Sequence, residues 1–135
     1  MLGATVLGFV LAQPASGGAG PGSTGTEPRH AEAGKAVFNG KGACSYCHGI
    51  DGHRNKLPRI EADTAALIAR LNPPPANLRE PDSLRLKTDR ERMNAIREGH
   101  PGTGMFPDTT MTDQELADTL AYLAVLRREG SVTPR

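Results

Sequence analysis

Two thiols and an imidazole lie close together in the segment Cys-Ser-Tyr-Cys-His, as Cys44, Cys47 and His48. Two cysteines separated by two residues can form thioether bonds to both vinyl groups of one haem. The histidine directly after the second cysteine then lies beneath the iron. Covalent attachment and the first axial ligand would come from the same short stretch. The spacing therefore predicts a c-type haem attachment site.

Three other kinds of site also use closely spaced cysteines: a redox-active dithiol, a zinc site and a structural disulfide. The chain has only two cysteines, so a zinc site would need ligands from His30, His53 or His100, which show no recognisable ligand spacing. A thioredoxin-like dithiol is expected within a βαβ unit, which the sequence pattern does not indicate. The histidine that follows Cys47 is explained by haem attachment and by none of these alternatives.

These residues resemble the attachment site of the monohaem class I cytochrome c family, and the resemblance extends from about residue 33 to residue 126. It implies an all-α cytochrome c fold, with about four helices around one covalently bound haem c and crossing N- and C-terminal helices. It also implies a one-electron carrier and not an enzyme, with no catalytic acid, base or nucleophile.

A second stretch, residues 99–107, resembles the Gly-Thr-x-Met-Pro loop of the same family. The resemblance implies that Met105 is the distal iron ligand. A thioether ligand favours ferrous over ferric iron, which raises the reduction potential relative to two histidines. In this chain Phe106 separates the methionine from the following proline, whereas relatives usually place proline directly after it. Met111, His100 and an open distal side remain the alternatives.

The proximal imidazole needs an acceptor for its free N–H, because this hydrogen bond sets the orientation and basicity of the ring. The backbone carbonyl of Pro58, ten residues after His48, is the first expected acceptor. Pro73 is the alternative, since relatives with a similar Pro-Pro-Pro-Ala-Asn-Leu segment line the haem crevice with these prolines.

Helical spacing places these groups on a small set of elements. A first helix is expected over residues 30–40, with Gly34 and Phe38 on the face that meets another helix. A last helix is expected over residues 113–128 with an apolar stripe of leucines and alanines. In the cytochrome c family these two helices cross. Between them, helices are expected over residues 61–71 and 89–98, the latter with Met93 and Ile96 facing inward.

Helix boundaries are marked by their own residue types. Thr112 and Glu115 form a capping box before the last helix, and Met111 can pack as a staple onto Leu116. Gly130 is expected to end that helix. A second capping box, Thr88 with Glu91, precedes the helix over residues 89–98, and Gly99 fits its C-terminal end.

Composition limits what the chain can be. With 135 residues it has room for one domain and a tail. Only 37% of residues are hydrophobic and 4% aromatic, so a core made of protein alone would be thin and a buried macrocycle would help to fill it. The net charge of +1 gives no electrostatic case for nucleic-acid binding and only a weak one for membrane surfaces.

The N-terminal part divides into two segments. Residues 1–12 are uncharged and mostly apolar, like the core of a secretory signal, although no Lys or Arg precedes them, and they are too short to span a bilayer. Residues 13–29 are rich in Gly, Ser, Thr, Pro and Ala and indicate a flexible leader. The cytochrome c domain is expected over residues 30–135. Export fits the family, which attaches haem outside the cytoplasm.

The resemblance thus predicts a periplasmic monomer, with a membrane tether through an uncleaved N-terminus as the alternative. Its partners would be a donor dehydrogenase or cytochrome complex and an acceptor oxidase or reductase. Two other functions stay open. The chain could be the haem c subunit of a larger oxidase or dehydrogenase complex, or a ligand-binding or peroxidatic haem protein with an open distal site.

Overall fold

The computed structural model describes residues 25–132. The proposed signal segment, residues 1–12, and most of the proposed leader, residues 13–24, lie outside the described residues. Every regular element in the described part is helical, which confirms the expected all-α fold. In chain order these are α1 (Thr26–Asn39), α2 (Ser45–His48), η2 (Ile50–Gly52), α3 (Ala62–Ala69), η3 (Pro81–Ser83), α4 (Asp89–Glu98) and α5 (Asp113–Val132).

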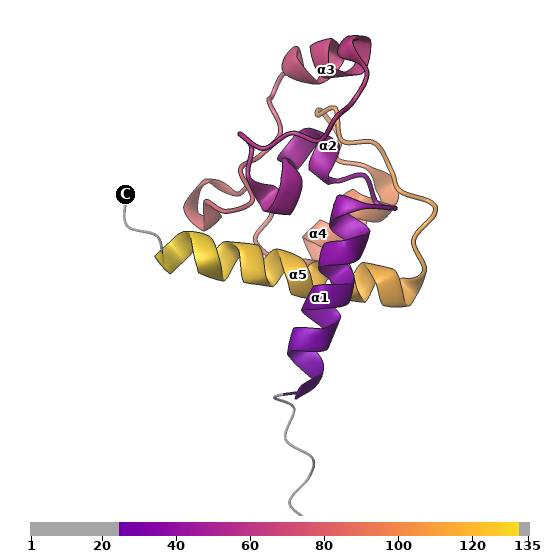
Figure 1. The fold of residues 1–135 in the computed structure, drawn as a ribbon. Coiled ribbons are helices and arrows are strands. Elements are labelled where there is room, and N and C mark those ends of the chain that lie inside the picture. The colour runs from indigo at the N-terminus through magenta and orange to yellow at the C-terminus, as the bar shows by residue number, and fades with distance from the viewer. Residues whose placement is uncertain (1–24, 133–135) are drawn as a thin grey trace, which may run out of the picture.

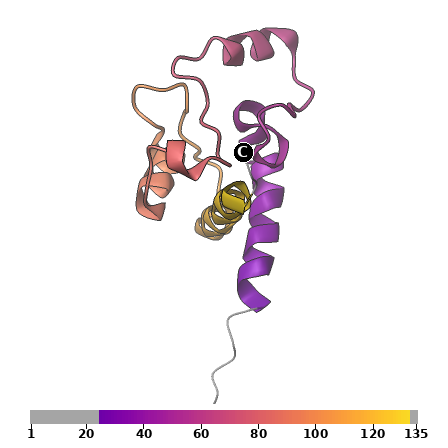
Figure 2. The same cartoon turned by 90° about the vertical axis from the view of Figure 1, so that its left-hand side faces the viewer.

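The first and last helices cross, as expected from the sequence. Figure 1 shows α1 running across α5, and Figure 2, in which α5 is seen almost end-on, shows the same two helices side by side. Gly34 lies at the crossing, where an added Cβ would collide with the carbonyl of Asp118 and lie 2.9 Å from the backbone nitrogen of Thr119. Glycine is therefore required here by the close approach of the two backbones.

The first helix begins earlier than its apolar spacing indicated. The structure places the start of α1 at Thr26, within the segment expected to be a leader, and not at residue 30. Pro28 lies in the first turn, where the backbone N–H groups have no partner within the helix, so proline costs little there. Glu27 in the same turn favours a helical start because its charge complements the helix dipole.

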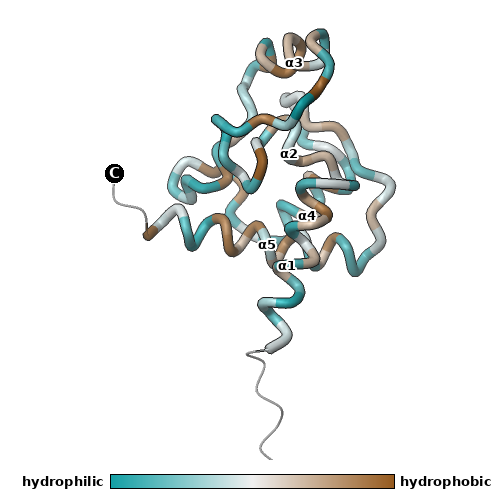
Figure 3. The backbone as a smooth tube through the Cα atoms, viewed as in Figure 1, coloured by the Kyte–Doolittle hydropathy of each residue, from teal (hydrophilic) through white to brown (hydrophobic). Residues whose placement is uncertain are grey.

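Two apolar clusters hold the helices together. One consists of Phe38, Tyr122 and Leu126, in which the two rings meet edge to face with centroids 5.5 Å apart. The other brings Met111 against Leu116, together with Ile96 of α4, and so confirms the expected staple. Apolar and polar stretches alternate along α5 (Figure 3), as an amphipathic helix at the centre of the fold requires.

The capping boxes are present where they were expected. Glu91 N donates to Thr88 Oγ1 at 3.2 Å, and Thr88 N donates to the Glu91 carboxylate at 2.8 Å. At the start of α5, Glu115 N donates to Thr112 Oγ1 at 3.1 Å, and Thr112 N donates to the Glu115 carboxylate at 2.8 Å. Both helix starts therefore lie close to where the sequence placed them.

The expected end of the last helix is wrong. Gly130 does not terminate α5 but lies within it, and the helix continues to Val132. A Cβ at position 130 would collide with the backbone of Arg79. Glycine is needed here because residue 79 packs closely against α5, and not because the helix ends. Among residues 25–132, no helix is both long enough and apolar enough to cross a lipid bilayer.

The interior helices differ from expectation in detail. α3 is shorter than the predicted helix over residues 61–71 and buries none of its residues, and Leu67 is 66% exposed. Figure 1 shows α3 at the edge of the molecule, away from α5. In α4, Ile96 is buried as expected, but Met93 is 37% exposed and does not face the core. Gly99 follows α4 with φ of 82°, which fits the expected C-terminal position.

Candidate functional site

A cavity of about 400 Å³ lies in the middle of the fold. In Figure 2, α1 and α2 lie on one side of α5, α4 and the loop that follows it lie on the other, and the chain around α3 passes above. This volume is typical of a cofactor site. The lining includes Cys44, Cys47, His48, Leu71, Pro73, Pro74, Pro75, Ala76, Ile96, His100, Met105, Met111 and Leu123.

Both cysteines line the cavity and neither forms a disulfide. Burial raises the pKa of Cys44 to about 11, with a further contribution from the negative charge of Asp108. Burial also raises the pKa of Cys47. Redox-active dithiols work through thiolates with lowered pKa values. The surroundings of this pair are therefore the opposite of those that activate a dithiol for exchange.

The imidazole of His48 lines the same cavity and makes one hydrogen bond to the backbone. Its Nδ1 lies 2.9 Å from the carbonyl oxygen of Ala76, which can only accept, so Nδ1 carries the hydrogen. Nε2 is left with its lone pair for a metal. Burial lowers the pKa of His48, which favours the neutral ring that a metal ligand needs.

The acceptor for His48 corrects the sequence-based expectation. It is Ala76, and neither Pro58 nor Pro73 supplies the carbonyl. Pro58 is not among the residues that line the cavity, whereas Pro73 lines it without bonding to the ring. The proline run ends at Pro75, and its restricted backbone directs the next carbonyl towards His48. No local pattern in the sequence singles out the carbonyl of Ala76, which lies 28 residues from His48.

The loop after α4 is held in shape by its own hydrogen bonds. His100 N donates to the Met105 carbonyl at 3.0 Å, and Thr103 Oγ1 donates to the His100 carbonyl at 2.7 Å. Met105 N in turn donates to Thr103 Oγ1 at 3.1 Å. These bonds close residues 100–105 into a compact loop that presents Met105 at the cavity. Phe106, the residue inserted before the proline, is 76% exposed.

The other proposed distal ligands lie at the same cavity in different settings. Met111 is only 4% exposed and packs in an apolar cluster, with its sulfur 4.0 Å from Thr119 Oγ1. This contact and the staple to Leu116 give Met111 a structural role. His100 lines the cavity at the start of the loop. The structure thus brings all three expected residues to the site.

The remaining histidines lie apart from the cysteines. His30 Nδ1 lies 2.5 Å from Asp118 Oδ1 at the crossing of α1 and α5. His53 is not among the cavity residues. Within residues 25–132, no group of three or more His, Cys, Asp and Glu side chains is arranged to hold a metal ion.

Comparison with known families identifies the fold. The cytochrome c family model matches residues 31–127, most of the chain and all of the cavity-lining segments. The chain belongs to the cytochrome c family. Comparisons with curated proteins and with solved structures gave no match. Family membership implies a haem c cofactor and a role in electron transport, and the Cys44 and Cys47 pair is consistent with covalent attachment.

The residues of this cytochrome c fit a haem on structural grounds alone. The cavity is of cofactor size, two protonated thiols face it three residues apart, and the neutral imidazole beside them has its Nδ1 occupied. The loop after α4 adds a thioether at the same cavity. Sequence reasoning missed one group of lining residues, the arginines Arg85, Arg92 and Arg127. They belong to no local motif, and only the fold brings them together.

Proposed function

We propose that this protein is a one-electron carrier whose haem c is attached through Cys44 and Cys47 and held between His48 and Met105. The bound haem supplies one iron that alternates between the ferrous and ferric states. The observation that carries the proposal is that these four side chains, from α2 and from the loop after α4, line one cavity.

The chain's own groups are suited to holding the site rigid in both oxidation states. The bond from His48 Nδ1 to the Ala76 carbonyl fixes the imidazole orientation. The hydrogen bonds among His100, Thr103 and Met105 fix the opposite loop. Leucine, proline and isoleucine side chains make much of the lining apolar. A site that changes little between oxidation states needs little reorganisation for each electron transfer.

With both axial positions taken, electrons would pass through an exposed haem edge to other redox proteins. The expected partners are a donor dehydrogenase or cytochrome complex and an acceptor oxidase or reductase, bound through small and transient contacts. We place the protein in the periplasm, because the apolar residues 1–12 resemble a secretory signal and the family attaches its haem outside the cytoplasm.

The test is the visible spectrum and midpoint potential of the Met105→Ala holoprotein. We expect loss of the absorption band that arises from charge transfer between thioether and ferric iron. We also expect the potential to fall by more than about 60 mV, a tenfold change in the one-electron reduction equilibrium. Met111→Leu is the matched control, since it removes the other nearby thioether, and it should leave the band in place.

Three outcomes would contradict parts of this proposal. Persistence of the band in Met105→Ala with its loss in Met111→Leu would transfer the ligand role to Met111. Ready binding of carbon monoxide by the unmodified reduced protein at neutral pH would favour an open distal side. Haem that stayed attached during denaturing extraction after both Cys44 and Cys47 were replaced by Ser would refute the attachment site.

A further inference from the structure

One part of the cavity wall is strongly basic. Arg92 of α4 and Arg127 of α5 line the cavity, and their side chains are only 11% and 21% exposed. Ser83 and Arg85, from the segment before α4, line the same cavity. Arginines are rarely this buried unless their charge is compensated. We therefore ask which negatively charged group compensates the charges of Arg92 and Arg127.

Both buried arginines form an ion pair with Asp89. Arg92 Nη2 also donates to the carbonyls of Leu86 and Lys87 at 3.0 Å and 3.1 Å. Arg92 Nη1 lies 2.8 Å from Asp89 Oδ1, and Arg127 Nη2 lies 3.5 Å from the same oxygen. Asp89 is itself 59% exposed. One carboxylate is thus shared by two guanidinium groups.

The electrostatics of Arg127 reflect this imbalance. Burial, and then the neighbouring charge of Arg92, lower the pKa of Arg127. Two like charges in a partly dry wall with one shared counterion are unfavourable, and a further anion in the cavity would relieve them.

The basic wall includes a residue of α4, which lies across the cavity from the attachment cysteines (Figure 2). Thr119, Leu123 and Arg127 recur every fourth residue on one face of α5 and all line the cavity, so this stripe extends about 12 Å. At its start, Thr119 Oγ1 lies 4.0 Å from the sulfur of Met111. A Cβ built at Gly42 would lie 2.7 Å from Met111 Cε and 3.4 Å from Cys44 Sγ. Cys44 packs against the Met111 cluster and also against the cluster of Phe38, Tyr122 and Leu126, so it lies beside the middle of this stripe. Arg92 belongs to α4, which lies on the other side of α5 from α2 and its cysteines (Figure 2).

We propose that Arg92 and Arg127 bind the propionate carboxylates of the haem and so fix which edge of the macrocycle faces α4. The proposal rests on haem c filling the cavity. A haem carries its vinyl groups and its propionates on opposite sides of the ring, so attachment at the cysteines directs the carboxylates towards the arginines. The planar guanidinium group matches a carboxylate with paired hydrogen bonds.

The part of the cavity near Cys44 disfavours a carboxylate. Asp108 lines the cavity there, and its negative charge contributes to the raised pKa of Cys44. A propionate near Asp108 would meet a like charge, whereas a propionate at Arg127 meets unbalanced positive charge. The charge distribution of the wall thus supports the same orientation as the covalent attachment.

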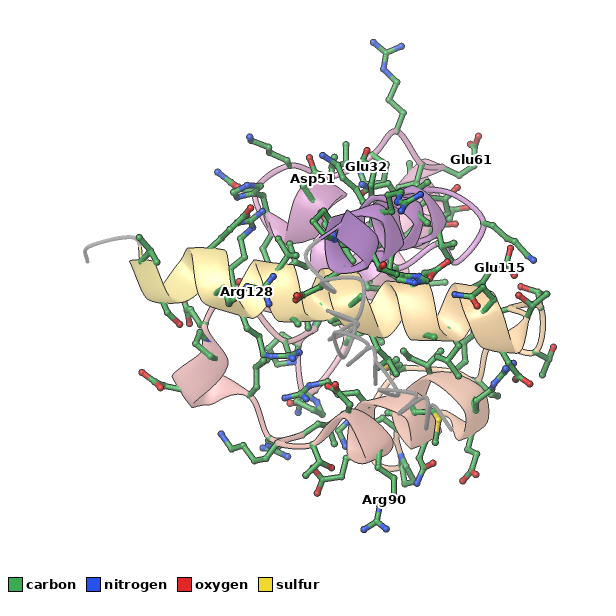
Figure 4. The ribbon with its side chains drawn as sticks, turned by 90° about the horizontal axis from the view of Figure 1, so that it is seen from below. Glu32, Asp51, Glu61, Arg90, Glu115 and Arg128 are labelled. Carbon is green, nitrogen blue, oxygen red and sulfur yellow. The ribbon has the colours of Figure 1, made fainter. Side chains whose placement is uncertain are left out.

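The test uses the holoprotein with haem labelled with ¹³C at the propionate carboxyl carbons. Infrared difference spectra between the oxidised and reduced states report the labelled carboxylate bands. The variants are Arg92→Gln, Arg127→Gln and Arg127→Lys. Arg90→Gln is the matched control, because Arg90 belongs to the same helix as Arg92 and projects away from the body of the protein (Figure 4).

We expect the labelled bands to shift in both glutamine variants, to shift less in Arg127→Lys, and to stay unchanged in Arg90→Gln. The proposal is overturned if the bands are unchanged in either cavity variant, or if they shift as much in the Arg90→Gln protein. The charge-transfer band between thioether and ferric iron tests the assignment of Met105 as ligand independently of the infrared result. Its absence from the unmodified protein would count against Met105 and leave the infrared comparison readable.

Discussion

Substitution of Gly34 by Ala tests the contact on which the whole fold depends. In an isolated helix this change is stabilising by about 1 kcal/mol, because alanine has the higher helix propensity. In α1 the new methyl group would collide with the Asp118 carbonyl and lie 2.9 Å from the Thr119 nitrogen. Both are backbone atoms of α5, so no side-chain rotation can relieve the overlap.

The two effects have opposite signs, and the collision should dominate. Overpacking of a tight contact typically costs about 1–3 kcal/mol and occasionally more. The contact joins the two longest helices, and the nearby Phe38 is fully buried against Tyr122, so separating the helices would also loosen that cluster. We therefore expect a net loss of about 1–3 kcal/mol in the free energy of unfolding.

Guanidinium chloride unfolding of the holoprotein, followed by far-ultraviolet circular dichroism, measures this loss. The matched control is Ala33→Gly, the reverse change at the neighbouring exposed position of the same helix. It should cost about 1 kcal/mol, which calibrates the propensity term in α1. A Gly34→Ala protein as stable as the unmodified one, or more stable, would refute the close crossing of α1 and α5.

Two further predictions concern charge and helix capping. Burial would raise the pKa of Asp51, but a hydrogen bond from Asn39, the charge of Lys35 and a hydrogen bond from Tyr122 hold it below its ordinary value. Its ionised form thus stabilises the fold at neutral pH, and that stability is lost as pH falls below about 4. Asp51→Asn should lower stability at pH 7 and flatten its fall on acidification, whereas parallel pH profiles would contradict the assignment. Thr112→Ala should cost about 1 kcal/mol in denaturant unfolding, because Glu115 N loses its capping acceptor, and an unchanged midpoint would argue against the cap.

The sequence was sufficient wherever the interaction is local. The attachment motif needs only Cys44, Cys47 and His48 at fixed spacing, and the structure places all three at one cavity. Each capping box joins residues three positions apart, so its geometry follows from the first turn of the helix. The resemblance to the cytochrome c family implied the all-α fold. Helical spacing placed Gly34 and Phe38 on the face that meets another helix, and both are buried in α1.

Only the tertiary structure decided the features that depend on distant segments. The carbonyl that binds His48 comes from Ala76, 28 residues away, and no local pattern distinguishes it from those of Pro58 or Pro73. In the sequence Gly130 indicated the end of a helix, but in the structure it allows the backbone of Arg79 to pack closely against α5. The basic wall of the cavity forms because α4 and α5 place Arg92 and Arg127 at one cavity. Spacing along the chain determines which groups can act together within a turn or two, whereas packing determines which carbonyls and charges from separate segments meet them.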